Sequence, residues 1–111
     1  MRSQPRGSVL IEPDYFRVLA LDDATAVTTS LPAPDDSFML MRGQMRAILA
    51  DVDFTVDSTG PVMVGQYLVS QMVTENVTGD PAFILVPPIA QFRTRYIFLV
   101  PSGYGTNYVL L

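Results

Sequence analysis

The segment GDPAFILVPPIAQFRTRYIFLV, residues 79–100, contains two runs of five apolar residues, AFILV and YIFLV. Each run is too short for a buried helix of ordinary length and far too short for a membrane span. Such runs suit strands buried on both faces, because these strands lose the alternation of inward and outward residues. Prolines bracket both runs, and proline cannot donate to a sheet ladder. The segment therefore predicts two short core strands.

The composition limits both the size of the fold and its chemistry. A chain of 111 residues suits one domain, and it is long enough to bury a stable core without disulfide bonds. It has no cysteine and no histidine, which removes thiolate metal sites, disulfides and the commonest general base. All seven basic residues are arginine, and the net charge of -4 makes nucleic acid a poor partner.

Short strand patterns separated by turn signals recur along the rest of the chain. Residues 15–21 and 25–31 flank Asp22 and Asp23, which suit a tight turn, so we predict a hairpin here. Strict alternation in DVDFTVD, residues 51–57, predicts another strand, and PVMVGQYLVSQ, residues 61–71, predicts a central one. These patterns together predict an all-β fold, an antiparallel β-sandwich of about seven to nine short strands.

Residues 38–50 carry two conflicting patterns. Apolar residues recur there at helical spacings of three and four, and Ser37 could cap such a helix. Gly43 lies in the middle of this pattern, where it costs a helix about 1 kcal/mol. We favour short strands and keep a single helix as the alternative.

The same patterns predict domain limits and a core. Residues 1–14 have no periodicity and suit a loose lead-in, so residues 15–111 form the single predicted β domain. Six apolar residues from the predicted central strands are expected to be deeply buried. They are Val64, Leu68, Ile84, Val86, Ile97 and Leu99.

Several motifs resemble one known family. PVMVGQY (61–67), GDPAFILVPPIAQF (79–92), YIFLVP (96–101) and a Tyr-containing turn before YV (104–109) are similar to consecutive motifs of the IgGFc-binding domain family. FRVLALDDATAV (16–27) resembles its upstream hairpin, and RGQ (42–44) resembles its turn before a strand that ends in an Asp-Phe pair. The resemblance runs from about Tyr15 to the C-terminus.

The resemblance implies a function and a context. Family domains occur at the N-terminus of the animal IgGFc-binding protein and in bacterial surface proteins, and they are longer than this chain. It therefore implies a binding or adhesion module that is secreted or on the cell surface, incomplete at both ends. The absence of lysine favours a bacterial source. No Fc-contacting motif is transferred to individual residues.

Two groups of residues are weak candidates for a binding site. Asp51, Asp53 and Asp57 lie on one face of the predicted strand and could bind calcium, which prefers oxygen ligands. Same-face residues are roughly 7 Å apart, so a solvated strand face is the competing interpretation. Arg93, Arg95 and Tyr96 could stack on a sugar or a base, or they could simply keep the adjoining apolar run soluble.

Catalysis has little support in the sequence. The chain has no histidine or lysine that could act as a base and activate a serine or threonine nucleophile. No two carboxylates have a sequence spacing that indicates a general acid–base pair. Asp80, between Gly79 and Pro81, suits a turn whose backbone it fixes. We therefore predict a non-enzymatic protein without a cofactor.

The favoured function is recognition of a macromolecular ligand, a protein or a glycan. Two alternatives remain open: a calcium-dependent carbohydrate-binding module, and a purely structural β-module of a larger surface protein. No stretch resembles a signal peptide or a membrane anchor. Residues 102–111 carry no charge, and such an unguarded strand edge predicts a homo-oligomer.

Overall fold

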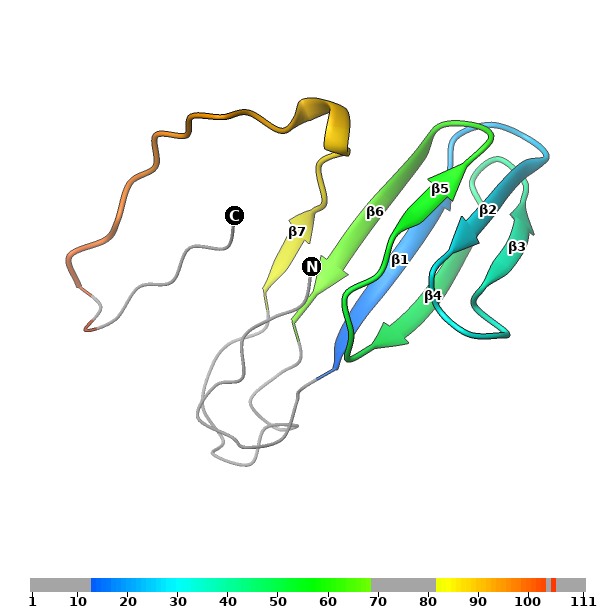
Figure 1. The fold of residues 1–111 in the computed structure, drawn as a ribbon, viewed down its shortest axis with the longest axis horizontal. Coiled ribbons are helices and arrows are strands. Elements are labelled where there is room, and N and C mark those ends of the chain that lie inside the picture. The colour runs from blue at the N-terminus through cyan, green and yellow to red at the C-terminus, as the bar shows by residue number, and fades with distance from the viewer. Residues whose placement is uncertain (1–12, 69–81, 104, 106–111) are drawn as a thin grey trace.

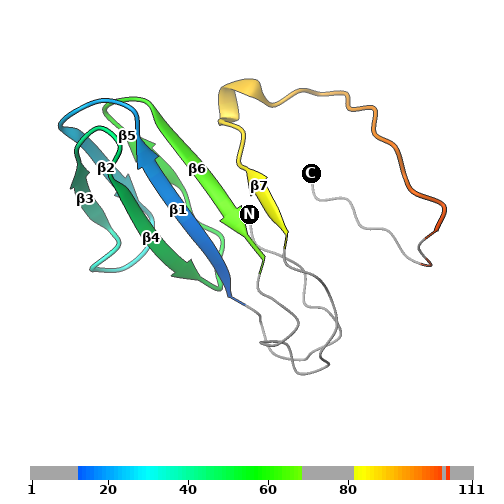
Figure 2. The same cartoon turned by 180° about the vertical axis from the view of Figure 1, so that it is seen from behind.

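The computed structural model describes residues 13–68, 82–103 and 105. These residues form an all-β fold of seven strands in two antiparallel sheets, with one short 3-10 turn, η1 (Ile89–Gln91). Figures 1 and 2 show the two sheets from opposite sides. The predicted fold class is confirmed.

Each sheet is assembled from strands that are distant in the sequence. The four-stranded sheet has the order β4-β1-β6-β7, and the three-stranded sheet has the order β3-β2-β5 (Figure 1). The bounds of the first four are β1 (Asp14–Ala20), β4 (Met45–Ala50), β6 (Val62–Tyr67) and β7 (Phe83–Leu85). Those of the other three are β2 (Thr25–Thr29), β3 (Ser37–Leu40) and β5 (Val56–Ser58).

The core lies between the two sheets. Phe16, Val18 and Ala20 of β1 point inward, while the residues between them point outward, as the alternation of a half-buried strand requires. The remaining buried apolar residues come from both sheets: Val27, Leu40, Ile48 and Ala50.

The predicted hairpin at residues 15–31 is wrong, because β1 and β2 belong to different sheets. The tight turn does exist: Ala24 has φ of 51°, and the Thr25 Oγ1 donates to the Asp22 carbonyl at 3.0 Å. Asp23 Oδ1 accepts the backbone N–H of Arg42 at 3.0 Å, which ties this turn to the next connection. Turn residues mark where the chain reverses, but the same residues serve a hairpin or a crossing between sheets.

The ambiguity at residues 38–50 resolves in favour of strands. The connection between β3 and β4 is a four-residue turn in which the Gln44 N–H donates to the Met41 carbonyl at 2.9 Å. Gly43 has φ of +78°, a left-handed conformation that only glycine adopts without strain. The glycine that opposed a helix is the residue that the turn requires.

Residues 51–57 form a shorter strand than predicted, because β5 begins only at Val56. The expected inward face is partly present: Phe54 and Val56 pack against the core, and the Phe54 ring meets the Phe16 ring edge to face at 4.9 Å. Val52, by contrast, is exposed.

The two long margins of the sandwich differ. At the margin of β3 and β4, Arg46 bridges Asp35 at 2.7 Å, and its Cζ lies 5.4 Å from the centre of the Phe38 ring. At the other margin, β7 extends the four-stranded sheet beyond β5 and faces no described strand of the other sheet (Figures 1 and 2). The sandwich is closed on one side and open on the other.

The predicted core residues near the open margin are wrong. Val64, Leu68 and Val86 are half-buried and Ile84 is exposed. Residues 96–100 form no strand, and the chain there runs away from both sheets, with Ile97 at 97% and Leu99 at 92% exposure (Figure 1). An apolar run makes a core strand only where both of its faces are covered.

Three predictions fall outside the described residues. These are the predicted lead-in at residues 1–14, of which only residues 13 and 14 are described, the turn at Asp80, and the uncharged C-terminal strand edge, of which residues 104 and 106–111 are not described. Strand β1 itself begins at Asp14.

Candidate functional site

The outer face of the four-stranded sheet is apolar over all four strands. Cross-strand register places its side chains in rows; Leu49, Tyr15, Tyr67 and Phe83 form the first row. Arg17 lies in the next row and is the one charged residue among the outward positions of these strands. We call this surface the apolar face. It consists of Tyr15, Arg17, Leu19, Met45, Ala47, Leu49, Met63, Gly65, Tyr67, Phe83 and Leu85.

The outer face of the three-stranded sheet has the ordinary polar character. Ser37, Thr28 and Asp57 form one row across β3, β2 and β5. Met39 is the large apolar residue on this face, and at 60% exposure it matches Leu49 on the apolar face. An antiparallel sandwich normally has polar outward residues on both sheets. The apolar face therefore departs from the pattern of an ordinary solvent-exposed sheet face.

Arg17 lies at the centre of the apolar face between two tyrosines. Its Cζ is 5.8 Å from the centre of the Tyr15 ring and 5.2 Å from that of Tyr67. Both distances are within the range of a cation–π interaction. In the described part of the chain, no carboxylate forms a salt bridge with Arg17. The guanidinium is thus positioned by aromatic rings and keeps its N–H groups available.

Gly65 makes room for the aromatic end of the apolar face. A Cβ at this position would lie 2.7 Å from Cε2 of the Phe83 ring, so any other residue would displace that ring. The Phe83 ring also packs on Tyr67, with ring centres 4.7 Å apart. Three aromatic residues are therefore neighbours in one row across the sheet: Tyr15, Tyr67 and Phe83.

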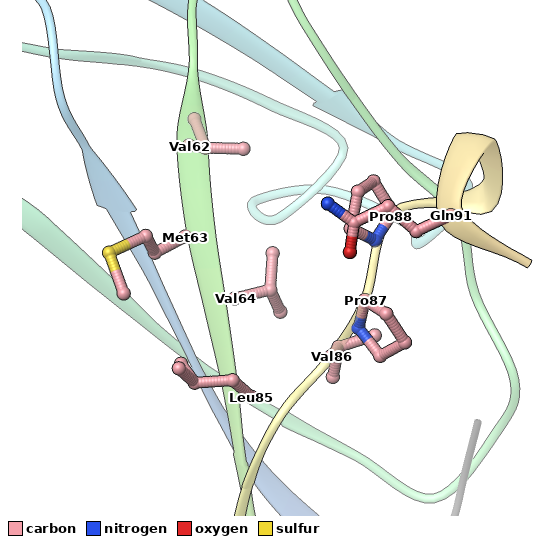
Figure 3. Close-up of a pocket in the computed structure, with 8 residues that line it drawn as sticks. All are labelled: Val62, Met63, Val64, Leu85, Val86, Pro87, Pro88 and Gln91. Carbon is pink, nitrogen blue, oxygen red and sulfur yellow. The ribbon is translucent and has the colours of Figure 1, made fainter.

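An open pocket of about 270 Å³ adjoins the apolar face at the margin of β7. Figure 3 shows Met63 and Leu85 on the opposite side of β6 from Val62 and Val64, which point toward Pro87 and Pro88. Gln91 supplies the polar side chain of the lining. The pocket continues the uncovered apolar surface around the open margin of the sandwich.

The structure places the three aspartates predicted as calcium candidates on the surface. Asp51 and Asp53 precede β5, and Asp57 lies within it. Among the described residues, no group of three or more acidic side chains is close enough to hold a metal ion.

The arginine and tyrosine candidates follow η1 and are exposed. The backbone N–H of Arg93 donates to Tyr96 Oη at 2.8 Å, which folds this short stretch locally. Arg95 is exposed beside them. A separate surface hollow of about 450 Å³ is lined by Ala90, Gln91, Phe92 and Arg93 and does not include Arg95 or Tyr96.

A family model described as IgGFc binding protein matches residues 3–111. The chain belongs to the IgGFc-binding protein family. Comparison with curated proteins and with solved structures gave no match. Within the described residues, no helix has the length and apolarity to cross a membrane. Family membership suggests a binding domain of an extracellular or surface protein.

Sequence reasoning missed the apolar face of this IgGFc-binding family member. A signal was present: β1 is apolar at Phe16 and Val18 and also at Tyr15 and Leu19, so apolar side chains occur on both faces of the strand, with Arg17 as the exception on the outer face. Such a pattern is typical of a strand covered on both sides. It indicates a covered outer face but does not say whether the same chain or a partner covers it.

Proposed function

We propose that this chain is a non-enzymatic binding module of a secreted or cell-surface protein, and that it recognises a macromolecular ligand through the apolar face. The observation that carries the proposal is the contrast between the two outer faces. Leu49, Phe83 and Leu85 are each more than half exposed on a surface with one charge. A patch of this kind on a folded domain is typical of an interaction site.

The shape of the apolar face supports a macromolecular ligand. Its rows extend over four strands and five residues of β1, roughly 14 Å in each direction at ordinary strand spacing. Small molecules bind in concave sites that enclose most of their surface, whereas protein partners cover flat patches. The family's description adds support for binding as the function and makes immunoglobulin Fc the first probe to test.

The side chains of the apolar face suit a protein interface. Aromatic residues, methionine and arginine are enriched in the centres of such interfaces, and other charged residues are depleted there. Tyr15, Tyr67 and Arg17 form a central group, with Met45 and Met63 beside it. Methionine side chains adapt to irregular partner surfaces.

Biolayer interferometry with the whole chain tests this proposal. Immunoglobulin Fc and a purified secreted mucin serve as immobilised probes, and the chain is compared with Leu49→Glu. We expect binding to at least one probe and a loss of at least about tenfold in the variant, because a charged side chain would replace an apolar contact in the interface.

The matched control is Met39→Glu, which adds the same charge at equal exposure on the opposite outer face. Its affinity should equal that of the parent. Absence of binding to both probes, or equal losses in the two variants, would contradict the proposal. Circular dichroism of each variant shows that the fold is retained.

A further inference from the structure

We infer that the partner is a protein whose contact surface presents one carboxylate to Arg17 within a ring of apolar side chains. This inference rests on the proposed function, because it concerns the same apolar face. It assigns Arg17 as the residue that sets the partner's charge.

The position of Arg17 carries the inference. Its guanidinium is the one charge on the apolar face and lies between the Tyr15 and Tyr67 rings. A partner that covers the neighbouring Leu49 and Leu85 also removes Arg17 from water. A buried charge without a counter-ion is strongly unfavourable, so the partner must provide an acceptor for the N–H groups.

A carboxylate is the acceptor that best matches this geometry. The planar guanidinium offers parallel N–H groups that bind both oxygens of a carboxylate at once. The two rings already restrict its orientation, which lowers the entropy lost when the pair forms. A lysine in the same place would be a mobile point charge without this directional fit.

A second copy of the chain does not meet this requirement. A two-fold contact between two apolar faces is self-complementary and brings each central residue close to its own copy. Arg17 would then meet Arg17, and like charges juxtaposed in an interface cost several kcal/mol. The apolar face therefore fits a different partner.

The aliphatic part of the face favours a protein over an acidic glycan. A sugar could stack on Tyr67 and Phe83 and present a carboxylate to Arg17. Leu49, Met45 and Leu85 would then remain exposed or face hydroxyl groups. A protein surface covers them with apolar side chains and gains about 25 cal/mol for each Å² removed from water.

The experiment uses a phage-displayed library of random twelve-residue peptides, selected on the whole chain and depleted on Leu49→Glu. We expect the selected peptides to be rich in Asp or Glu next to apolar residues. One selected peptide is then synthesised, together with a version that carries Lys in place of its acidic residue.

Charge reversal at Arg17 provides the decisive measurement. Arg17→Glu should weaken binding of the acidic peptide by about 30-fold or more and should prefer the Lys peptide. Arg42→Glu makes the same change in net charge in the exposed turn between β3 and β4 and should leave both affinities unchanged.

Each contrary result has a distinct meaning. The selected peptides could depend on Leu49, contain no excess of Asp or Glu, and bind Arg17→Glu as tightly as the parent. That result would overturn this inference and leave the proposed function standing. Failure to select any peptide that distinguishes the parent from Leu49→Glu, together with no Arg17-dependent binding on a glycan array, would contradict both. Binding of sialylated oligosaccharides on a glycan array that depends on Arg17, without peptide binding, would replace the protein partner by an acidic glycan.

Discussion

Gln66 donates a hydrogen bond from Nε2 to Asp14 Oδ2 at 2.6 Å between two buried side chains. The bond joins β6 to the start of β1 within the core. We expect Gln66→Leu, which keeps the size and removes the donor, to lower the free energy of unfolding by about 2 kcal/mol. Urea denaturation followed by circular dichroism measures this change. Gln91→Leu, at an exposed position, should stay within about 0.5 kcal/mol of the parent.

Asp51 and Asp53 allow a test of the calcium-dependent alternative. Because no metal-holding group of acidic residues occurs in the described part of the chain, we expect calorimetric titration with calcium to give no saturating heat. Asp51→Asn and Asp53→Asn should not change the trace. Saturable binding that either variant abolishes would favour the calcium-dependent carbohydrate-binding module instead.

At the scale of elements, the β3–β4 turn depends on one glycine. Gly43 has φ of +78°, where an L-residue costs about 1 kcal/mol. Gly43→Ala should therefore lower the free energy of unfolding by about that amount in thermal or urea melts. Gly103→Ala is the matched control, because an added Cβ meets no atom within 4 Å at either glycine and only Gly43 of the two has a left-handed φ. Equal stability of Gly43→Ala and the parent would show that the turn tolerates another conformation.

The sequence predicted the positions of the strands better than it predicted which sheet each strand joins and what covers its faces. Apolar runs and alternation located most strands, including β4, β6 and β7, and Gly43 correctly opposed a helix. Local signals do not say which sheet a strand joins, so the turn at Asp22 and Asp23 was interpreted as a hairpin. They also do not say what covers a strand, so Ile84 was assigned to the core and the apolar face was missed.

At the scale of the whole molecule, the two sheets leave apolar surface in two places. One is the apolar face, which has Arg17 at its centre between the Tyr15 and Tyr67 rings. The other is the open margin, where β7 extends past the three-stranded sheet and Ile84 remains 42% exposed. Residues 96–100, apolar and exposed, lie beyond this margin in the sequence.

The open margin and residues 96–100 both expose apolar side chains, so we propose that the chain forms a homo-oligomer in which residues 96–100 of one copy cover the open margin of another. An extended apolar segment that adds to an exposed sheet is a common mode of association.

We expect light scattering after gel filtration to show a dimer or larger species. The double substitution Ile97→Asp with Leu99→Asp should give a monomer with unchanged circular dichroism, because these side chains contribute little to the core of a single copy. Leu49→Glu should retain the oligomer, since Arg17 opposes self-association through the apolar face. A parent chain that stays monomeric at high concentration, or a double variant that still associates, would contradict the role of residues 96–100.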